Sequence, residues 1–248
     1  MNTADETPIY FILGATGAVG RALAHRLSRD GAHVVVAGRN LAELEELADE
    51  VAGVPLRVDG RDFDQVAAAF EEAQNLPGNF VGAANCAGSI LLKPAHLTTA
   101  RDLDDTLATN LGTAFAVVRA AGRAFRRGGG SVVLVSSAAA SIGLANHEAI
   151  AAAKAGIEGL TRSAAATYAT SGIRFNAVAP GLVDSKMSRR IVDNPKALEA
   201  SLALHPVGRV GRPEEIADVM AWLLSPAGSW VSGQVWGIDG GLGRLKTR

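Results

Sequence analysis

Short apolar segments alternate along this chain with longer segments whose apolar residues recur at helical spacing. Runs such as 9–13 and 33–37 are rich in β-branched and aromatic residues, which favours strands. The segment 41–51 instead places its leucines on one stripe and its acidic residues elsewhere, as an amphipathic helix does. The predicted strands are 9–13, 33–37, 56–58, 80–84, 131–135, 174–178 and 234–238, and the predicted helices are 19–29, 41–51, 63–75, 100–126, 147–170 and 213–224.

Continuous apolar strands that alternate with helices are typical of a parallel sheet covered on both faces. No linker, internal repeat or low-complexity tract interrupts the pattern. The sequence therefore predicts an α/β fold, with a doubly wound sheet of about seven strands in one domain spanning 1–248. The helix-rich stretch 185–205 has no strand partner, and we expect it to form a lid over a binding site.

Composition excludes several classes of protein. The 24 lysines and arginines are balanced by 25 acids, so no strongly basic surface for nucleic acid is expected. A single cysteine, Cys86, rules out an internal disulfide and a cysteine-based metal cluster, and no metal site is predicted. No apolar run reaches the roughly 18 residues of a membrane span, and the acidic N-terminus does not resemble a signal peptide. We expect a cytoplasmic protein without membrane contact.

Three glycines follow the first strand, at the point where the first helix begins. Gly14, Gly17 and Gly20 are spaced three residues apart. Glycines between a strand and a helix let backbone N–H groups approach a pyrophosphate at the helix N-terminus. The alternative is a glycine-rich turn without a ligand. The position at the end of the first strand favours a dinucleotide site.

The second predicted strand ends at Gly38 and Arg39, where NAD-binding sites usually carry an acid for the ribose hydroxyls. An acid would repel a 2′-phosphate, whereas an arginine can pair with it in a bidentate way. The sequence therefore predicts NADP(H) as the cofactor. The alternative is that Arg39 is only a surface residue.

Further motifs resemble those of the short-chain dehydrogenase/reductase family in the family's order, over essentially the whole chain. They are Asp59, Asn85-Cys86-Ala87-Gly88, Asn110, Val135-Ser136-Ser137, Lys154, the stretch 173–183 with Pro180-Gly181, Ser185, and the C-terminal segments 209–217 and 232–241. The resemblance implies a Rossmann fold and hydride transfer between a nicotinamide cofactor and a small-molecule substrate. It implies a catalytic set of Asn110, Ser137 and Lys154, and cofactor contacts from Gly14, Thr16, Gly17, Val19, Gly20, Arg39, Asp59, Asn85, Ala87, Gly88, Lys154, Pro180, Gly181, Val183 and Ser185.

The chain departs from the family's pattern at two places. Leu13 and Ala18 replace a threonine and a glycine of the main-branch glycine motif, so the spacing resembles that of the extended branch. More seriously, the family's tyrosine four residues before the lysine is absent. Ile150 stands there, thirteen residues after Ser137.

The missing tyrosine affects proton transfer, because in this family the tyrosine is the acid that protonates the substrate oxygen. Isoleucine can neither donate nor accept a proton. His147 is a candidate replacement, since on a continuous helix it would share a face with Ile150 and Lys154. The alternative is that His147 is simply a polar residue at the start of a helix.

Two hypotheses of function remain open. The first is an NADP(H)-dependent oxidoreductase acting on a carbonyl or an activated C=C bond, in which case Lys186, Arg189 and Arg190 are either contacts for an acidic substrate or merely solvated. The second is a cofactor-binding protein without turnover, with a regulatory or structural role, which Ile150 favours. The nine alanines between 149 and 169 predict a helix buried on several faces, and with the family resemblance a homodimer or homotetramer.

Overall fold

The computed structural model describes residues 7–246 and contains one parallel sheet of seven strands, confirming the predicted fold class. The strand order is β3-β2-β1-β4-β5-β6-β7, and every neighbouring pair is parallel. The N-terminal segment 1–6 lies outside the described residues. Its acidic residues were the reason not to predict a signal peptide. The strands are β1 (Pro8–Leu13), β2 (His33–Gly38), β3 (Val54–Arg57), β4 (Asn79–Asn85), β5 (Gly130–Val135), β6 (Ile173–Pro180) and β7 (Val235–Ile238).

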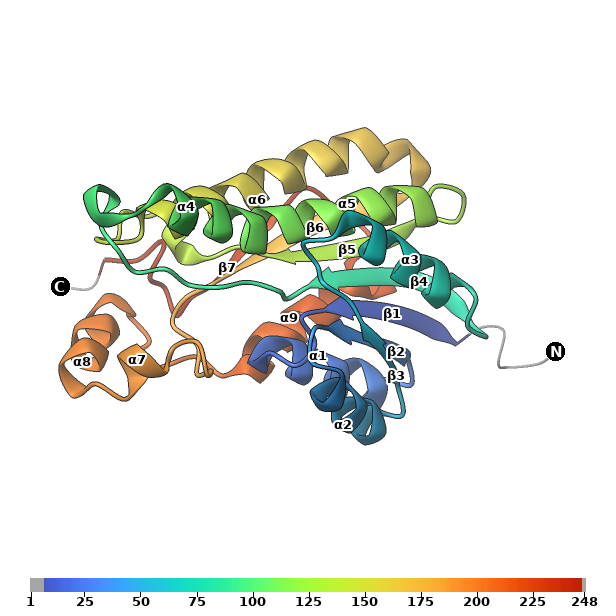
Figure 1. Cartoon of the computed structure of the whole chain (residues 1–248), viewed down its shortest axis with the longest axis horizontal. Helices are drawn as coiled ribbons and strands as arrows, with labels where there is room; N and C mark the ends of the chain where they lie inside the picture. Colours follow the sequence, from blue (N-terminus) through green and yellow to red (C-terminus); the bar gives the residue numbers. More distant parts are fainter. Residues whose placement is uncertain (1–6, 247–248) are drawn as a thin grey trace.

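Helices cover both faces of the sheet (Figure 1). Helices α1 (Ala18–Arg29), α2 (Leu41–Val51) and α9 (Pro213–Leu224) pack on one face, and α3 (Phe63–Gln74), α5 (Thr113–Ala124) and α6 (Glu148–Tyr168) pack on the other. Strand β1 alternates between the two cores, because Phe11 faces one core and Ile12 the other. A strand buried on both faces is apolar throughout, which explains the continuous runs in the sequence.

One long predicted helix is interrupted in the structure. The segment 100–126 forms α4 (Ala100–Leu107), a π-helical turn at Ala108–Gly112, and then α5. Side-chain periodicity continues through all three, so the pattern alone predicts one helix. The interruption places Asn110 in the π-helical turn, and such turns are frequent at functional sites.

The sheet has a topological switch point between β1 and β4. The chain winds outward from β1 to β3 and then returns to β4, which lies on the other side of β1. The connections therefore leave in opposite directions, and a crevice forms at the carboxyl ends of these two strands. This is where the glycine turn and the Asn85–Gly88 segment both lie.

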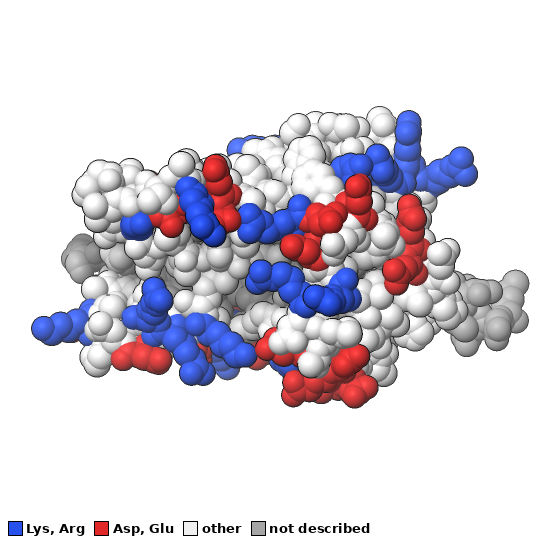
Figure 2. All heavy atoms as spheres, in the orientation of Figure 1, with Lys and Arg blue, Asp and Glu red and all other residues white. Residues whose placement is uncertain are grey.

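The segment 185–205 contains two short helices, α7 (Arg189–Val192) and α8 (Pro195–Leu204), beyond the carboxyl ends of the strands (Figure 1). Neither helix has a buried residue. Basic side chains gather over this part of the surface, whereas acidic ones gather over α2 (Figure 2). The helices lie where a lid is expected, and their role as a lid stays a prediction.

Within residues 7–246, no helix combines the length and the apolar character needed to cross a membrane.

Candidate active site

The turn after β1 fits tightly against the end of β4. Gly14 has a φ of +77°, and a Cβ added there would lie 2.4 Å from the backbone nitrogen of Ala87. A Cβ at Gly20 would lie 2.4 Å from the carbonyl oxygen of Gly14. The turn, the first turn of α1 and the β4 segment are therefore in backbone contact, which only glycine allows at these two positions.

The N-terminus of α1 is open to a ligand. Its N-cap residue, Gly17, has no side chain to accept a hydrogen bond from the first N–H groups, and the first turn carries no acid. Thr16 and Val19 flank the turn and are half-buried. Uncapped N–H groups and the helix dipole favour an anion at this place. The turn thus fits the pyrophosphate of a dinucleotide.

Gly14→Ala is expected to lower the free energy of unfolding by about 1–3 kcal/mol, because alanine is strained at this φ and its methyl group meets the Ala87 backbone. In a domain of this size each kcal/mol corresponds to about 2–4 °C in Tm. Gly143→Ala is the matched control, because a Cβ there meets nothing within 4 Å. Equal thermal stability of the two variants would contradict the packing described here.

A hollow of about 490 Å³ lies at the carboxyl ends of β2 and β3, lined by Arg39, Arg57, Asp59 and Gln65. Both arginines are exposed, and neither forms an ion pair with any residue from 7 to 246. Two guanidinium groups at the rim of one hollow suit a dianion such as a phosphate monoester. Sequence reasoning missed Arg57, because the predicted strand 56–58 extended past it, whereas β3 ends there opposite Gly38.

Lys154 lies on α6 with its side chain directed at the end of β5. The residue is only 7% exposed, and its Nζ donates to the carbonyl oxygen of Val135 at 2.8 Å. The Oγ of Ser136 donates to the carbonyl oxygen of Lys154 at 3.1 Å, so the helix and the strand are held together at this point. Burial lowers the pKa of the Lys154 ammonium to about 8. Two of its three donors remain for a ligand.

Gly88 brings Asn110 and Lys154 together. A Cβ added at Gly88 would lie 2.9 Å from Asn110 Oδ1 and 3.5 Å from Lys154 Nζ. Asn85 holds the loop 85–88 against α5. Its Oδ1 accepts from the Ala87 N–H at 3.2 Å, and its Nδ2 donates to Thr113 Oγ1 at 3.1 Å. The site therefore needs a residue without a side chain at position 88.

Asn110 uses both Nδ2 hydrogens and one lone pair of its Oδ1 within the protein. Its Nδ2 donates to the Thr106 carbonyl oxygen at 2.9 Å and to Ser89 Oγ at 3.1 Å, and its Oδ1 accepts from the Ser89 N–H at 3.3 Å. Asn110 therefore ties the π-helical turn to the segment after β4. It orients the site, and its Oδ1 keeps one lone pair for a further donor.

Ser137 comes directly before the turn 138–140, which packs against α6, the helix that carries Ile150 and Lys154. Ser137 ends the β5 segment, and its Oγ accepts from the Ala139 N–H at 3.2 Å. Because that bond uses a lone pair, the hydroxyl hydrogen is left to be donated. Ile150 lies one helical turn before Lys154 and is 4% exposed. An apolar side chain is thus buried on the helix that carries Lys154.

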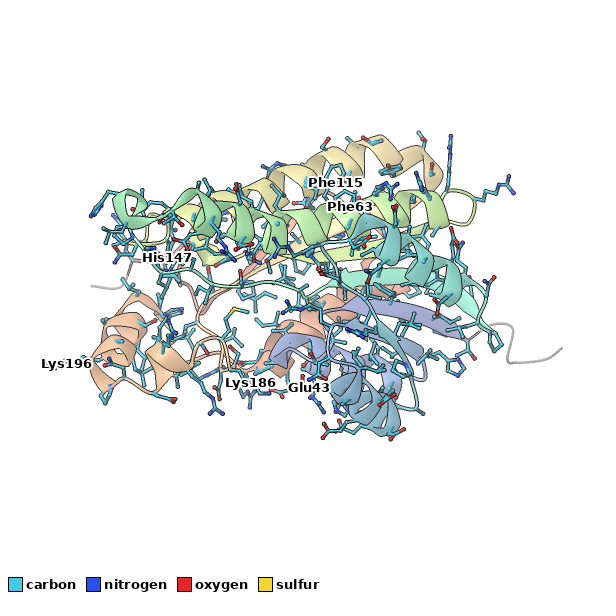
Figure 3. All side chains as sticks on the ribbon, viewed as in Figure 1. Glu43, Phe63, Phe115, His147, Lys186 and Lys196 are labelled. Carbon is cyan, nitrogen blue, oxygen red and sulfur yellow. The ribbon has the colours of Figure 1, made fainter. Side chains whose placement is uncertain are left out.

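The structure places His147 at the very start of α6, and its role as an acid stays a prediction. Helix α6 begins at Glu148, so His147 precedes it as the N-cap residue, with a non-helical backbone. The helix thus starts one residue later than predicted, although the His147 carbonyl oxygen accepts the first helical hydrogen bond, from the Ala151 N–H at 2.7 Å. The Nδ1 of His147 lies 2.7 Å from the carbonyl oxygen of Ala145, and the residue, labelled in Figure 3, is half-buried. Helix boundaries read from sequence are uncertain by one or two residues, and His147 is the first residue of the predicted helix.

The segment after β6 closes the crevice on the side of the predicted lid. The Gly181 N–H donates to the Ile238 carbonyl oxygen, and Val183 pairs with Gly211. Pro180, which ends β6, is half-buried, and the Oγ of Ser185 lies 3.1 Å from that of Ser188. The backbone in this segment is held by hydrogen bonds at several points.

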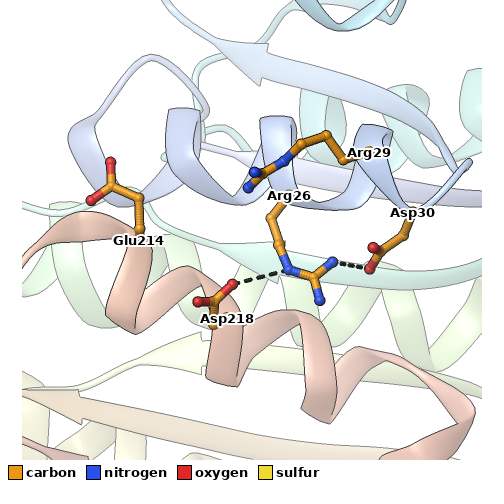
Figure 4. Close-up of a pocket in the computed structure, with 5 residues that line it drawn as sticks. All are labelled: Arg26, Arg29, Asp30, Glu214 and Asp218. Atoms are coloured by element: carbon orange, nitrogen blue, oxygen red, sulfur yellow. Dashed lines mark hydrogen bonds and ion pairs between the residues drawn. The ribbon is translucent and has the colours of Figure 1, made fainter.

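Two other features carry no catalytic geometry. Burial raises the pKa of the Cys86 thiol to about 12, so it is not a nucleophile at neutral pH. A second hollow, between α1 and α9, is lined by five charged residues, and Arg26 pairs with two of them (Figure 4). There Arg26 donates to Asp218 at 3.0 Å and also to Asp30, so its guanidinium joins the two helices.

Comparisons with known protein families and sequences agree with this geometry. The family model described as "Enoyl-(Acyl carrier protein) reductase" matches residues 14–243. A cis-4-hydroxycyclohexanecarboxylate dehydrogenase of Sinomonas cyclohexanicum is 36% identical over 253 residues, covering 97% of this chain and 98% of that protein. The 3-oxoacyl-(acyl-carrier-protein) reductase FabG of Thermotoga maritima is 34% identical over 245 residues, covering 96% and 98%.

Solved structures share the whole fold. A short-chain type dehydrogenase/reductase from Mycobacterium ulcerans superposes with a TM-score of 0.91 at 28% identity, covering 96% of this chain and 90% of that one. A variant of actinorhodin polyketide ketoreductase, solved with NADPH, gives 0.90 at 26% identity and covers 99% and 100%. The similarity thus extends over the glycine turn, the Lys154 site and the segment 185–205.

Proposed function

Because this chain belongs to the short-chain dehydrogenase/reductase family, we propose that it is an NADP(H)-dependent oxidoreductase that acts on a carbonyl or an activated C=C bond. The observation that carries the proposal is the meeting of buried Lys154 and Asn110 at Gly88, where Lys154 also binds the end of β5. A buried lysine without a carboxylate partner is costly. A site that keeps it has a use for its charge.

The choice of NADP(H) rests on the hollow with Arg39 and Arg57. Two unpaired guanidinium groups attract the charged 2′-phosphate of NADP(H). They cannot form an equivalent ion pair with the uncharged 2′-hydroxyl of NAD(H). One structural neighbour, the actinorhodin polyketide ketoreductase variant, was solved with NADPH. The glycine turn and the open N-terminus of α1 would hold the pyrophosphate.

In this proposal the bound nicotinamide supplies or accepts the hydride, and the chain's own residues position the reactants. Lys154 uses its two remaining donors to hold the cofactor's ribose. Ser137 donates its hydroxyl hydrogen to the substrate oxygen, where negative charge develops. Asn110 keeps the π-helical turn and Gly88 in place, so that Lys154 is oriented without a second protein partner.

Ile150 determines which substrates this arrangement suits. Ketone reduction requires a proton at the oxygen as the hydride arrives at carbon, and losing the general acid typically costs about 10²–10⁴ in rate. An activated C=C bond instead needs an oxygen that is stabilised while carbon is protonated later. We therefore expect enoyl substrates to be less affected by Ile150 than ketones.

The rival hypothesis is a protein that binds NADP(H) without turnover, and Ile150 favours it. NADPH oxidation measured against a panel of ketones and enoyl thioesters separates the two. Turnover with any member of the panel that is lost in Ser137→Ala supports the enzyme. Tight NADPH binding without turnover across the panel supports the rival.

Lys154→Met is expected to stabilise the protein at pH 7 while weakening NADPH binding. The pKa of Lys154 is lowered by burial, so the unfolded chain binds the proton more tightly, and the charged form costs stability below about pH 8. Removing the charge should raise the free energy of unfolding by about 1–2 kcal/mol at pH 7. The gain should shrink as the pH rises from 8 towards 10.5, because the wild-type amine is then neutral in the folded state.

Denaturant titrations at pH 7 and pH 10 measure this difference, and Lys196→Met, at an exposed position, is the control. If Lys154→Met is less stable than wild type at both values of pH, the ammonium stabilises the fold and is not a cost retained for function.

We also propose a homo-oligomer that assembles through the outer face of α6. Ala152, Ala155 and Gly159 are exposed on this helix, and a Cβ at Gly159 meets nothing within 4 Å. Phe115, on α5, is 49% exposed and stacks on Phe63 (Figure 3). Small residues beside an exposed aromatic pair suit a helix that packs closely on its symmetry mate.

Gly159→Trp is therefore expected to dissociate the oligomer without unfolding the subunit, because the indole has open space in the isolated chain. Light scattering at micromolar concentration measures the mass, and Gly128→Trp, at an exposed loop glycine with equal space, is the control. A wild-type monomer, or an oligomer indifferent to Gly159→Trp, would exclude this face.

A further inference from the structure

The two lid helices are anchored through polar side chains at their ends rather than through an apolar face. Neither α7 nor α8 has a buried residue. The two buried residues that flank them are Ser188, 8% exposed, and His205, 5% exposed. An amphipathic helix normally holds its position by burying one face. Apolar residues of the two helices such as Ile191, Leu198 and Leu202 are half-buried, so the fully buried contacts of this segment are those of Ser188 and His205.

Both side chains bind the backbone of one segment, the stretch that follows β6. The Oγ of Ser188 donates to the Val183 carbonyl oxygen at 2.7 Å and accepts from the Ser185 N–H at 3.0 Å. The Nε2 of His205 accepts from the Leu182 N–H at 3.0 Å. The beginning and the end of the lid are thus fixed to residues 182–185.

The hydrogen bonds of His205 define its tautomer. A backbone N–H is only a donor, so Nε2 must be the acceptor facing Leu182. The other nitrogen, Nδ1, then carries the hydrogen and donates to the Ser201 carbonyl oxygen, in the last turn of α8, at 2.7 Å. One imidazole therefore links the end of the lid helix to the loop after β6.

His205 also explains the glycine at position 181. A Cβ added there would lie 2.7 Å from His205 Nε2 and 3.0 Å from the Cα of Asp239. The ring therefore packs directly on the backbone of Gly181, between Pro180 and Leu182. The sequence resemblance places cofactor contacts in this segment, at Pro180, Gly181 and Val183.

We infer that His205 is a positioning residue that couples the lid to the cofactor-binding loop. A ligand that holds residues 181–183 in place holds the Leu182 N–H, and through the imidazole it holds the last turn of α8. Cofactor binding then orders the last turn of α8 without touching that helix. The coupling to cofactor rests on the proposed function, whereas the link between Leu182 and α8 does not.

Two substitutions separate this role from simple filling of the core. His205→Gln keeps an acceptor for Leu182 and a donor for Ser201 on a side chain of similar length. His205→Phe keeps a ring of similar shape but removes both hydrogen bonds. His96→Phe, at an exposed histidine, is the matched control.

The experiment is amide hydrogen exchange on the full chain, with and without saturating NADPH. In the absence of NADPH, His205→Phe should exchange the Leu182 amide about fivefold faster than wild type, as expected for one lost hydrogen bond. With NADPH, residues 195–204 should become protected in wild type, in His205→Gln and in His96→Phe, but not in His205→Phe.

Protection of residues 195–204 by NADPH that is equal in wild type and His205→Phe would overturn the coupling. A failure of His205→Gln to restore it would overturn the role of the hydrogen bonds. If wild type does not bind NADPH at all, the proposed function fails, and the measurement without cofactor decides alone. An unchanged Leu182 amide in His205→Phe then overturns the inference.

Discussion

Ile150→Tyr is expected to raise kcat/KM for the reduction of a simple ketone by NADPH by about tenfold to 10²-fold or more. Ile150 is buried one helical turn before Lys154, and a phenol at this position would add a general acid to the site. The Lys154 ammonium would favour the phenolate form and so tune the acid towards neutral pH. Steady-state kinetics with one ketone and one enoyl thioester measure the effect.

The matched control for this gain is Ile150→Phe, which introduces the same ring without the hydroxyl. Tyrosine and phenylalanine cause nearly the same change of shape. A gain in ketone reduction that is seen only with tyrosine is therefore due to proton donation by its hydroxyl group. The enoyl thioester should respond little to either substitution. A wild-type enzyme as fast on ketones as Ile150→Tyr would mean that another group already delivers the proton.

His147→Ala tests the remaining sequence-based candidate for that group. The ring bonds to the Ala145 carbonyl oxygen and lies before the first turn of α6, so we expect no loss of ketone reduction. A large loss, together with a pH profile that disappears in the variant, would identify His147 as the acid.

The wild-type protein is expected to bind NADPH at least about tenfold more tightly than NADH, a difference of about 1.4 kcal/mol. Arg39 and Arg57 are both free to pair with the 2′-phosphate, and Gly38 offers no carboxylate to the ribose. Arg39→Ala and Arg57→Ala should each weaken NADPH binding and leave NADH binding unchanged. The double substitution Gly38→Asp with Arg39→Ala should reverse the preference.

Isothermal calorimetry with both cofactors measures this preference. Arg61→Ala is the control, because Arg61 lies near the same strand end but already pairs with Asp105 at 2.9 Å. Equal affinities of wild type for NADPH and NADH would contradict the assignment of the hollow. A response to Arg39→Ala alone would remove Arg57 from the site.

Much of the fold follows from the local sequence. Strands such as β2 and β5 are buried on both faces, so each shows as a continuous apolar run. At Gly14 and Gly20 the backbone of another segment comes too close for a side chain, so glycine is required at both positions. This requirement is visible in the sequence as the spacing of the glycines. Helices α2 and α9 have the predicted boundaries because their apolar stripes end at the residues that leave the core.

The features that sequence reasoning missed depend on contacts between distant segments. Asn110 lies within an unbroken helical pattern, and its π-helical turn is stabilised by Ser89, which lies 21 residues earlier. Arg57 becomes part of the cofactor hollow only through the register of β2 and β3. In the sequence, nothing distinguishes His205 from the other polar residues of its helix-rich stretch. Its contact with the Gly181 backbone is seen only in the structure. At His147 the periodicity instead extended the predicted helix, 147–170, by one residue beyond the start of α6.

The central claim is that this site binds and orients NADP(H) while lacking an acid for the substrate oxygen. The most direct test measures NADPH affinity and single-turnover ketone reduction in the same samples of wild type, Ile150→Phe and Ile150→Tyr. The account predicts similar affinities in all three proteins and a reduction rate that rises by about tenfold or more only in Ile150→Tyr. A wild-type rate equal to that of Ile150→Tyr, or no NADPH binding by the wild type, would contradict it.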